Sequence, residues 1–145
     1  MIFGDERDQY RRVFTDAWRK LTEGAPLEPL ERAIATVIDA HPEYQEALTD
    51  PESLVRDYPV GGGETNPFLH MGMHITIIEQ ITSDRPAGIC ALYDGLRCGF
   101  NDSHALEHAM MECLAWSLRE AREQGRMPDE ERYLACLRQL KSRVL

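Results

Sequence analysis

The chain has 145 residues, of which 43% are hydrophobic and 28% charged, as is ordinary for a soluble globular protein with one hydrophobic core. Its net charge of -9 argues against the basic surface that nucleic acids and anionic membranes require, so we expect neither as a partner. No apolar run approaches the roughly 20 residues of a membrane-spanning helix. The opening segment MIFGDERDQYRR carries no secretory signal, so we expect a cytoplasmic protein.

Four cysteines occur, and none of them belongs to a C-x-x-C pair. Because no export signal precedes them, we interpret all four as reduced thiols that mostly serve in packing. They are Cys90, Cys98, Cys113 and Cys136.

Apolar residues recur with helical periodicity, whereas alternating strand patterns are nearly absent. The first helix is predicted at about residues 5–22. The second is predicted at about 28–40, with Pro29 in its first turn. The following segment, HPEYQEAL, is compatible with a short helix. Residues 49–65 contain two prolines and three consecutive glycines, so they are predicted to be the one long loop and the most mobile segment.

The residue pattern after residue 65 predicts four further helices. The first of them begins with Asn66 as its N-cap and Pro67 at its first helical position. Asp102 or Ser103 is predicted to cap a later helix, which ends at Gly125. The predicted ranges are about 66–82, 86–98, 103–124 and 128–143. The fold class is therefore all-α, a compact bundle of five to six helices in a single domain over residues 1–145.

Four of the five histidines form two pairs with i,i+4 spacing. His70 and His74 lie in the apolar run NPFLHMGMHITIIEQI, and His104 and His108 lie in HALEHAMMECLAW. At about 100° per residue, each pair shares one face of its helix, and the first pair lies in the middle of the apolar stripe. Each pair also lies near the start of its helix. In an up-down-up bundle these helices run parallel, so we expect both pairs at the same depth.

If the two apolar stripes face each other, four imidazoles converge. Neutral imidazole is the commonest metal ligand among side chains, so this pattern predicts a transition-metal site. Zn or Fe is favoured, and Cu or Ni also suits imidazole. Glu107 is the best candidate for a further ligand or a general base, Glu79 is a weaker one, and Glu31 and Glu112 are less readily placed. The predicted metal ligands are His70, His74, His104 and His108, with His41 as an addition.

Two other interpretations stay open at this point. The histidines could be packing groups, and an acidic surface that includes Glu120, Glu123 and residues 129–131 could make the protein a non-enzymatic adaptor or protein-binding domain. A Cys–His nucleophile built on Cys98 or Cys113 is weaker, because buried cysteine is ordinarily inert. The sequence does not decide whether the protein is a redox or hydrolytic enzyme, or whether it forms a homodimer.

Several blocks resemble an uncharacterised bacterial family, the domain of unknown function number 1841. They are NPFLHMGMH, DRPAGI, HALEHAMMECL and PDEERYLACL, with LEPLERAI and HPEY nearer the N-terminus. The resemblance spans nearly the whole chain and implies a cytoplasmic bacterial protein without an established activity. The HPEY element of the family often continues into another histidine. This chain has Gln45 there, which puts a ligand role for that position in doubt.

Two further similarities concern the metal chemistry. The run from His104 to His108 matches H-x-x-E-H, the inverted pattern of zinc peptidases, although those enzymes are far larger than this chain. Histidines on facing helices are similar to the sites of hemerythrin-like bundles, whereas the Glu-x-x-His pattern of ferritin-like di-iron proteins does not occur.

Overall fold

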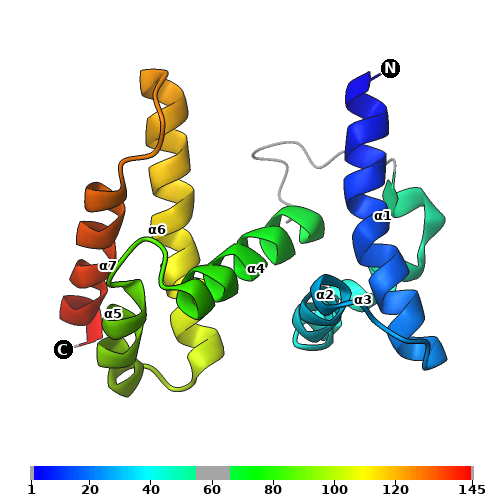
Figure 1. The fold of residues 1–145 in the computed structure, drawn as a ribbon, viewed down its shortest axis with the longest axis horizontal. Helices are drawn as coiled ribbons and strands as arrows, with labels where there is room; N and C mark the ends of the chain where they lie inside the picture. Colours follow the sequence, from blue (N-terminus) through cyan, green and yellow to red (C-terminus); the bar gives the residue numbers. More distant parts are fainter. Residues whose placement is uncertain (1, 55–65, 145) are drawn as a thin grey trace. The chain divides into compact units, whose positions relative to one another are not determined.

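The computed structural model describes residues 2–54 and 66–144, and all regular elements in this part of the chain are helices (Figure 1). They comprise seven α-helices and two 3-10 helices. The all-α class is therefore confirmed. The predicted count of five to six is slightly low because HPEYQEAL forms a helix of its own. The chain divides into two compact units, Met1–Ile75 and Thr76–Leu145, and a single domain over residues 1–145 stays a prediction.

The first unit begins with three helices that pack on one another (Figure 1). Helix α1 (Ile2–Glu23) contacts both α2 (Pro29–Asp39) and α3 (Pro42–Thr49). Pro29 opens α2 as predicted, because its fixed φ suits the first helical position. Pro42 ends α2 and opens α3, because the residue before a proline is driven out of the α region.

The predicted loop at 49–65 begins with a short helical turn. Helix η1 (Pro51–Leu54) follows α3 directly, and the backbone N–H of Glu52 donates a hydrogen bond to the Asp50 side chain at 3.0 Å. Residues 55–65, on which the predicted mobility depends, lie outside the described residues.

Helix α4 (Pro67–Ser83) carries the first histidine pair and crosses from one unit into the other at Ile75. The predicted N-cap is confirmed, since the Asn66 side-chain oxygen accepts hydrogen bonds from the N–H groups of Phe68 and Leu69 at 3.0 and 3.2 Å. The Phe68 ring packs edge-on against Phe14 of α1, with 5.9 Å between ring centroids. This aromatic contact fixes the start of α4 on α1.

The second unit contains α5 (Ile89–Leu96), η2 (Arg97–Gly99), α6 (Ser103–Gln124) and α7 (Glu130–Val144). Helices α6 and α7 form an antiparallel pair, and α5 packs against α7 (Figure 1). The predicted bounds of α6 are confirmed. Asp102 caps its start by accepting a hydrogen bond from Ala105 N–H at 2.7 Å, and Gly125 ends it in the left-handed region at φ 64°.

Two predicted helix starts in this unit come too early. The helix predicted from residue 86 begins at Ile89, because the Asp84 side chain binds the N–H groups of Gly88 and Cys90 in a turn. The helix predicted from Pro128 begins at Glu130. Here the Asp129 side chain accepts hydrogen bonds from the next turn and so acts as the cap.

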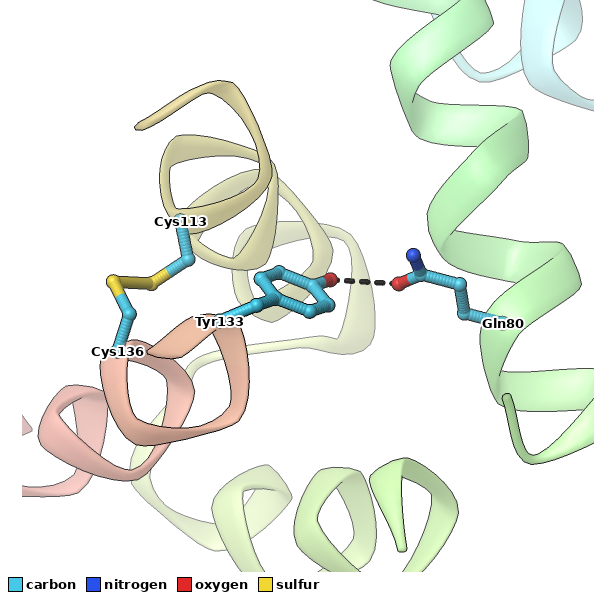
Figure 2. Close-up of a disulfide and its surroundings, with 4 residues drawn as sticks. All are labelled: Gln80, Cys113, Tyr133 and Cys136. Carbon is cyan, nitrogen blue, oxygen red and sulfur yellow. Dashed lines mark hydrogen bonds between the residues drawn. A yellow bond between two sulfur atoms is a disulfide. The ribbon is translucent and has the colours of Figure 1, made fainter. Parts of the chain in front are cut away.

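A disulfide joins the two long helices of the second unit (Figure 2). Cys113 of α6 and Cys136 of α7 lie with their Cα atoms 5.8 Å apart, within the range that a disulfide spans. The interpretation of all four cysteines as reduced thiols is therefore wrong for this pair, whereas Cys90 and Cys98 are free. The antiparallel packing of α6 on α7 brings these distant cysteines together, and no short-range motif signals it.

None of the helices in the described ranges is both long enough and apolar enough to cross a membrane.

Removing the disulfide should weaken the fold measurably. The double variant Cys113→Ala/Cys136→Ala is expected to unfold with a free energy lower by about 3 kcal/mol, because the bridge restricts the unfolded chain across a separation of 23 residues. Urea denaturation under oxidising conditions measures the difference. Cys98→Ala, at an exposed position, is the control and should leave the transition unchanged. Equal stability of the double variant and the wild type would contradict this expectation.

Gly72 of α4 lies directly under Tyr10 of α1, and a Cβ atom at position 72 would overlap with the Tyr10 hydroxyl oxygen. Without that hydroxyl, the nearest atom would be the ring carbon at 3.5 Å, an ordinary contact. Whether Gly72→Ala stabilises or destabilises the protein should therefore depend on the side chain at position 10.

In the wild type, Gly72→Ala should destabilise the protein by up to about 2 kcal/mol, since overpacking of about 1–3 kcal/mol outweighs a helix-propensity gain of about 1 kcal/mol. In a Tyr10→Phe background the overlap disappears, and the same change should stabilise by up to about 1 kcal/mol. Urea denaturation of the wild type, Gly72→Ala, Tyr10→Phe and the double variant measures both effects. The same sign in both backgrounds would contradict the proposed contact.

Candidate metal-binding histidines

His41 is the most constrained histidine of the first unit. It is fully buried between α2 and α3, and its Nδ1 lies 2.7 Å from the backbone carbonyl oxygen of Val37. A carbonyl oxygen can only accept, so Nδ1 must carry the proton and the neutral ring has its lone pair on Nε2. A backbone acceptor on one nitrogen that leaves the other able to bind is the usual arrangement of metal-ligating histidines.

The local sequence explains why His41 has this acceptor. The last turn of a helix leaves carbonyl oxygens without intrahelical partners, and Val37 belongs to the last turn of α2. Pro42 holds His41 outside the α region, at φ -126° and ψ 70°. The imidazole therefore turns back onto the end of α2 and satisfies one of these carbonyls.

The two histidines of α4 contact His41. The His74 ring is buried and stands edge-on to the His41 ring, with centroids 5.1 Å apart. One ring nitrogen of His41 and one of His74 lie within 4.8 Å of each other. Two ligand atoms of a tetrahedral zinc ion are roughly 3.4 Å apart, which lies inside this limit. The half-buried His70 ring lies 5.0 Å from His41, also edge-on. The structure thus brings together all three histidines predicted for this part of the chain.

Tyr44, which the HPEY segment places close to His41, completes this cluster. Its ring stacks on His41 at 5.6 Å between centroids and meets the edge of His70 at 5.5 Å. Burial raises the pKa of the Tyr44 hydroxyl, and the nearby Glu43 carboxylate raises it further. The HPEY sequence carried a signal for this, since Tyr44 lies three residues after His41 and within the first turn of α3.

The second unit holds the other predicted pair. The rings of His104 and His108 lie 4.0 Å apart between centroids, one turn from each other on α6. They too offer nitrogens within 4.8 Å of one another, and both side chains are half-buried. The i,i+4 spacing is sufficient to explain this contact, because such residues lie one above the other on a helix.

Glu107 lies beside this pair and is held by a second helix. Its Oε2 accepts a hydrogen bond from the Tyr93 hydroxyl of α5 at 3.2 Å. Burial raises the pKa of Tyr93, and the charge of Glu107 raises it further. Tyr93 was not predicted, because the contact depends on how α5 packs within the unit and no spacing in the sequence signals it.

The weaker carboxylate candidates have other surroundings. Glu31 accepts a hydrogen bond from Lys20 at 2.6 Å and another from Glu28 N–H at 2.9 Å, so it caps the start of α2, and Lys20 lowers its pKa. Glu79 and Glu112 are exposed.

The alternative of a cysteine nucleophile, built on Cys98 or Cys113, is excluded for Cys113. Cys113 is bonded to Cys136 and cannot serve as a thiolate in this state, whereas Cys98 is an exposed free thiol on η2.

These features define an all-helical protein with histidines clustered in each of its two units. The sequence profile of a family described as domain of unknown function (DUF1841) matches residues 6–139, and the chain belongs to this family. No curated protein and no solved structure is similar enough to the chain to count as a match. The family description names no activity.

The contact between Tyr93 and Glu107 predicts a pH effect. Glu107→Gln should lower the pKa of Tyr93 towards its ordinary value of 10.0, because the negative charge disappears while burial persists. A raised pKa means that the fold favours the neutral phenol. The contribution of Tyr93 to the stability of the fold is therefore complete below the ordinary pKa of 10.0. It is lost as the pH rises through the raised pKa of the folded protein.

Carbon NMR of ring-labelled tyrosine, titrated to high pH, measures this pKa, and Tyr93→Phe assigns the signal. Tyr133, whose pKa is also raised by burial and which bonds to Gln80, is an internal control that should not move. An unchanged or higher Tyr93 pKa in Glu107→Gln would show that the carboxylate does not act on the phenol.

Proposed function

We propose that this protein binds a transition metal ion through its histidines. One observation carries the proposal: the hydrogen bond between His41 Nδ1 and the Val37 carbonyl leaves the lone pair of a fully buried imidazole on Nε2. The ring is held in that tautomer before any ion arrives. Binding would therefore need no change of tautomer and little loss of side-chain freedom.

Ligand number supports sharing of one ion by the two pairs. A structural zinc site takes four protein ligands, and a catalytic one takes three and a water. The pair His41 and His74 supplies two, and the pair His104 and His108 supplies two more. We propose that both pairs serve the same ion. The sequence supports this proposal, because His74 and its neighbour His70 have the same i,i+4 spacing as His104 and His108. His70, whose ring contacts His41, is proposed as a further ligand.

The donor set limits the choice of metal. Imidazole nitrogens suit Zn, Fe, Cu and Ni, and soft thiolate ligands are not part of the proposed set. A bound ion with an open position would supply Lewis-acid or redox chemistry. In that case Glu107, held by the Tyr93 hydroxyl, is the proposed carboxylate ligand or general base.

Metal analysis of protein purified without a histidine tag tests the proposal. We expect about one equivalent of a transition metal per chain, and Zn²⁺ titration of stripped protein should give the same stoichiometry. His74→Ala and His108→Ala should each lower the affinity by more than about tenfold, because each removes one ligand. Replacing His70 in the same series tests whether it is a ligand.

Two outcomes would contradict the proposal at different levels. Stripped protein that binds neither Zn²⁺ nor Fe²⁺ would contradict metal binding itself. Two equivalents, of which His74→Ala removes one and His108→Ala the other, would contradict the shared ion. Circular dichroism of each variant separates lost ligands from lost structure. Glu123→Gln, at an exposed position of α6, is the matched control.

Binding of a protein partner through an acidic surface is the competing function. One residue of that surface, Glu120, is already engaged in ion pairs. Glu120 accepts hydrogen-bonded ion pairs from Arg126 at 2.7 Å and Arg132 at 2.8 Å, so its charge is largely balanced within the second unit. A purely structural role for the histidines would make His74→Ala less stable without changing the metal content.

A further inference from the structure

A surface cavity opens beside the disulfide of the second unit. Its volume is about 550 Å³, and it lies along the facing turns of α6 and α7. Both bridged cysteines line it, together with Glu112, Trp116, Arg132 and Gln139. The proposed metal site uses none of these residues.

The cavity gives a small solute access to the disulfide from one side. Cys113 is only 1% exposed, whereas Cys136 is half-buried. An attacking thiolate must reach one sulfur along the line of the S–S bond, with the other as the leaving group. Because Cys136 is the more exposed of the two residues, we expect its sulfur to be the one attacked.

Opposite charges line this cavity. Glu112 comes from α6 and Arg132 comes from α7. The guanidinium of Arg132 lies over the Trp116 ring, 5.6 Å from its centroid, and is also held by Glu120 at 2.8 Å. A ligand that carries both an ammonium group and a carboxylate would therefore meet a side chain of opposite charge for each, and guanidinium is the favoured partner of a carboxylate.

We propose that the Cys113–Cys136 disulfide is a thiol–disulfide exchange site for small zwitterionic thiols, that is, amino-acid or short-peptide thiols. The incoming thiolate attacks Sγ of Cys136. The bond to Cys113 breaks, and Cys113 leaves with the electron pair and takes up a proton from water. The product is a mixed disulfide on Cys136.

A second thiol completes the exchange. Its thiolate attacks the sulfur of the bound small thiol and releases Cys136 as a thiol, together with a small-molecule disulfide. Two small thiols are thereby oxidised, and the protein bridge takes up two electrons and two protons.

The fold of the second unit supports reversibility. Helices α6 and α7 also pack through buried apolar side chains on both helices, so their contact does not depend on the bridge alone. These side chains include Leu114, Leu134 and Leu137. The reduced protein is therefore expected to stay folded and able to form the bridge again.

The test uses the oxidised full-length protein and two probes, glutathione and the neutral thiol 2-mercaptoethanol. Samples are quenched with acid, and mass spectrometry of proteolytic peptides locates the adduct. We expect glutathione on Cys136 under native conditions. Per thiolate, glutathione should react up to about fivefold faster than 2-mercaptoethanol, the effect of an exposed charge contact.

Variants test the charge recognition. Arg132→Gln and Glu112→Gln should each reduce the preference for glutathione, whereas Arg138→Gln, on α7 but outside this cavity, should keep it. Glu112→Gln carries the test if the loss of the Arg132 ion pair disturbs folding. Circular dichroism verifies each variant.

Three results would overturn the proposal. A bridge that glutathione opens only after urea has unfolded the chain would exclude an exchange site. An adduct on Cys113 in place of Cys136 would reverse the proposed direction of attack. Equal rates for the two thiols, unchanged in Arg132→Gln and Glu112→Gln, would exclude recognition of a zwitterion.

Discussion

The hydrogen bond from His41 to the carbonyl of Val37 links the local fold of the first unit to its chemistry. A buried imidazole needs an acceptor for its N–H, and the end of a helix needs donors for its carbonyls. Both needs are met by one contact at the turn between α2 and α3. The same contact fixes the tautomer, and thereby decides which nitrogen a metal ion could use. One contact thus ends the helix and fixes the imidazole tautomer.

The ring contacts around His41 extend this constraint to α4. His74 and His70 both stand edge-on to His41, and Tyr44 stacks on it. Edge-to-face contacts orient rings as well as bury them, so the cluster is a packed element of the first unit. The second unit holds its pair differently. There the helical spacing of His104 and His108 is sufficient, and α5 contributes Tyr93 to orient Glu107.

Helix α6 combines two kinds of chemistry. Its first turns carry the proposed ligands His104 and His108, and Cys113 follows within about two turns. The disulfide holds this part of α6 on α7, where Tyr133 reaches Gln80 of α4 at 2.6 Å (Figure 2). The proposed exchange site would therefore act on the same unit that positions half of the proposed metal ligands. A thiol-exchange reaction and a metal-binding function are chemically compatible, because they use separate side chains.

Much of the helical architecture was predictable because its signals are local. Asn66, Asp102 and Gly125 have the capping roles expected of their residue types. The two helix starts that were predicted too early arise because a side chain competes for backbone N–H groups, which hydrophobic periodicity does not reveal. Asp84 and Asp129 bind backbone N–H groups and delay the helix starts that neighbouring prolines suggested.

The i,i+4 spacing was enough to place His104 and His108 on one face, and likewise His70 and His74, because helical geometry relates residues four apart without regard to the rest of the chain. The packing of the helices was needed to bring His41 to His74, Tyr93 to Glu107, and Cys113 to Cys136. The two members of each pair come from separate segments of the chain. Their approach depends on which faces pack and on how the connections close, and neither is encoded at any fixed spacing.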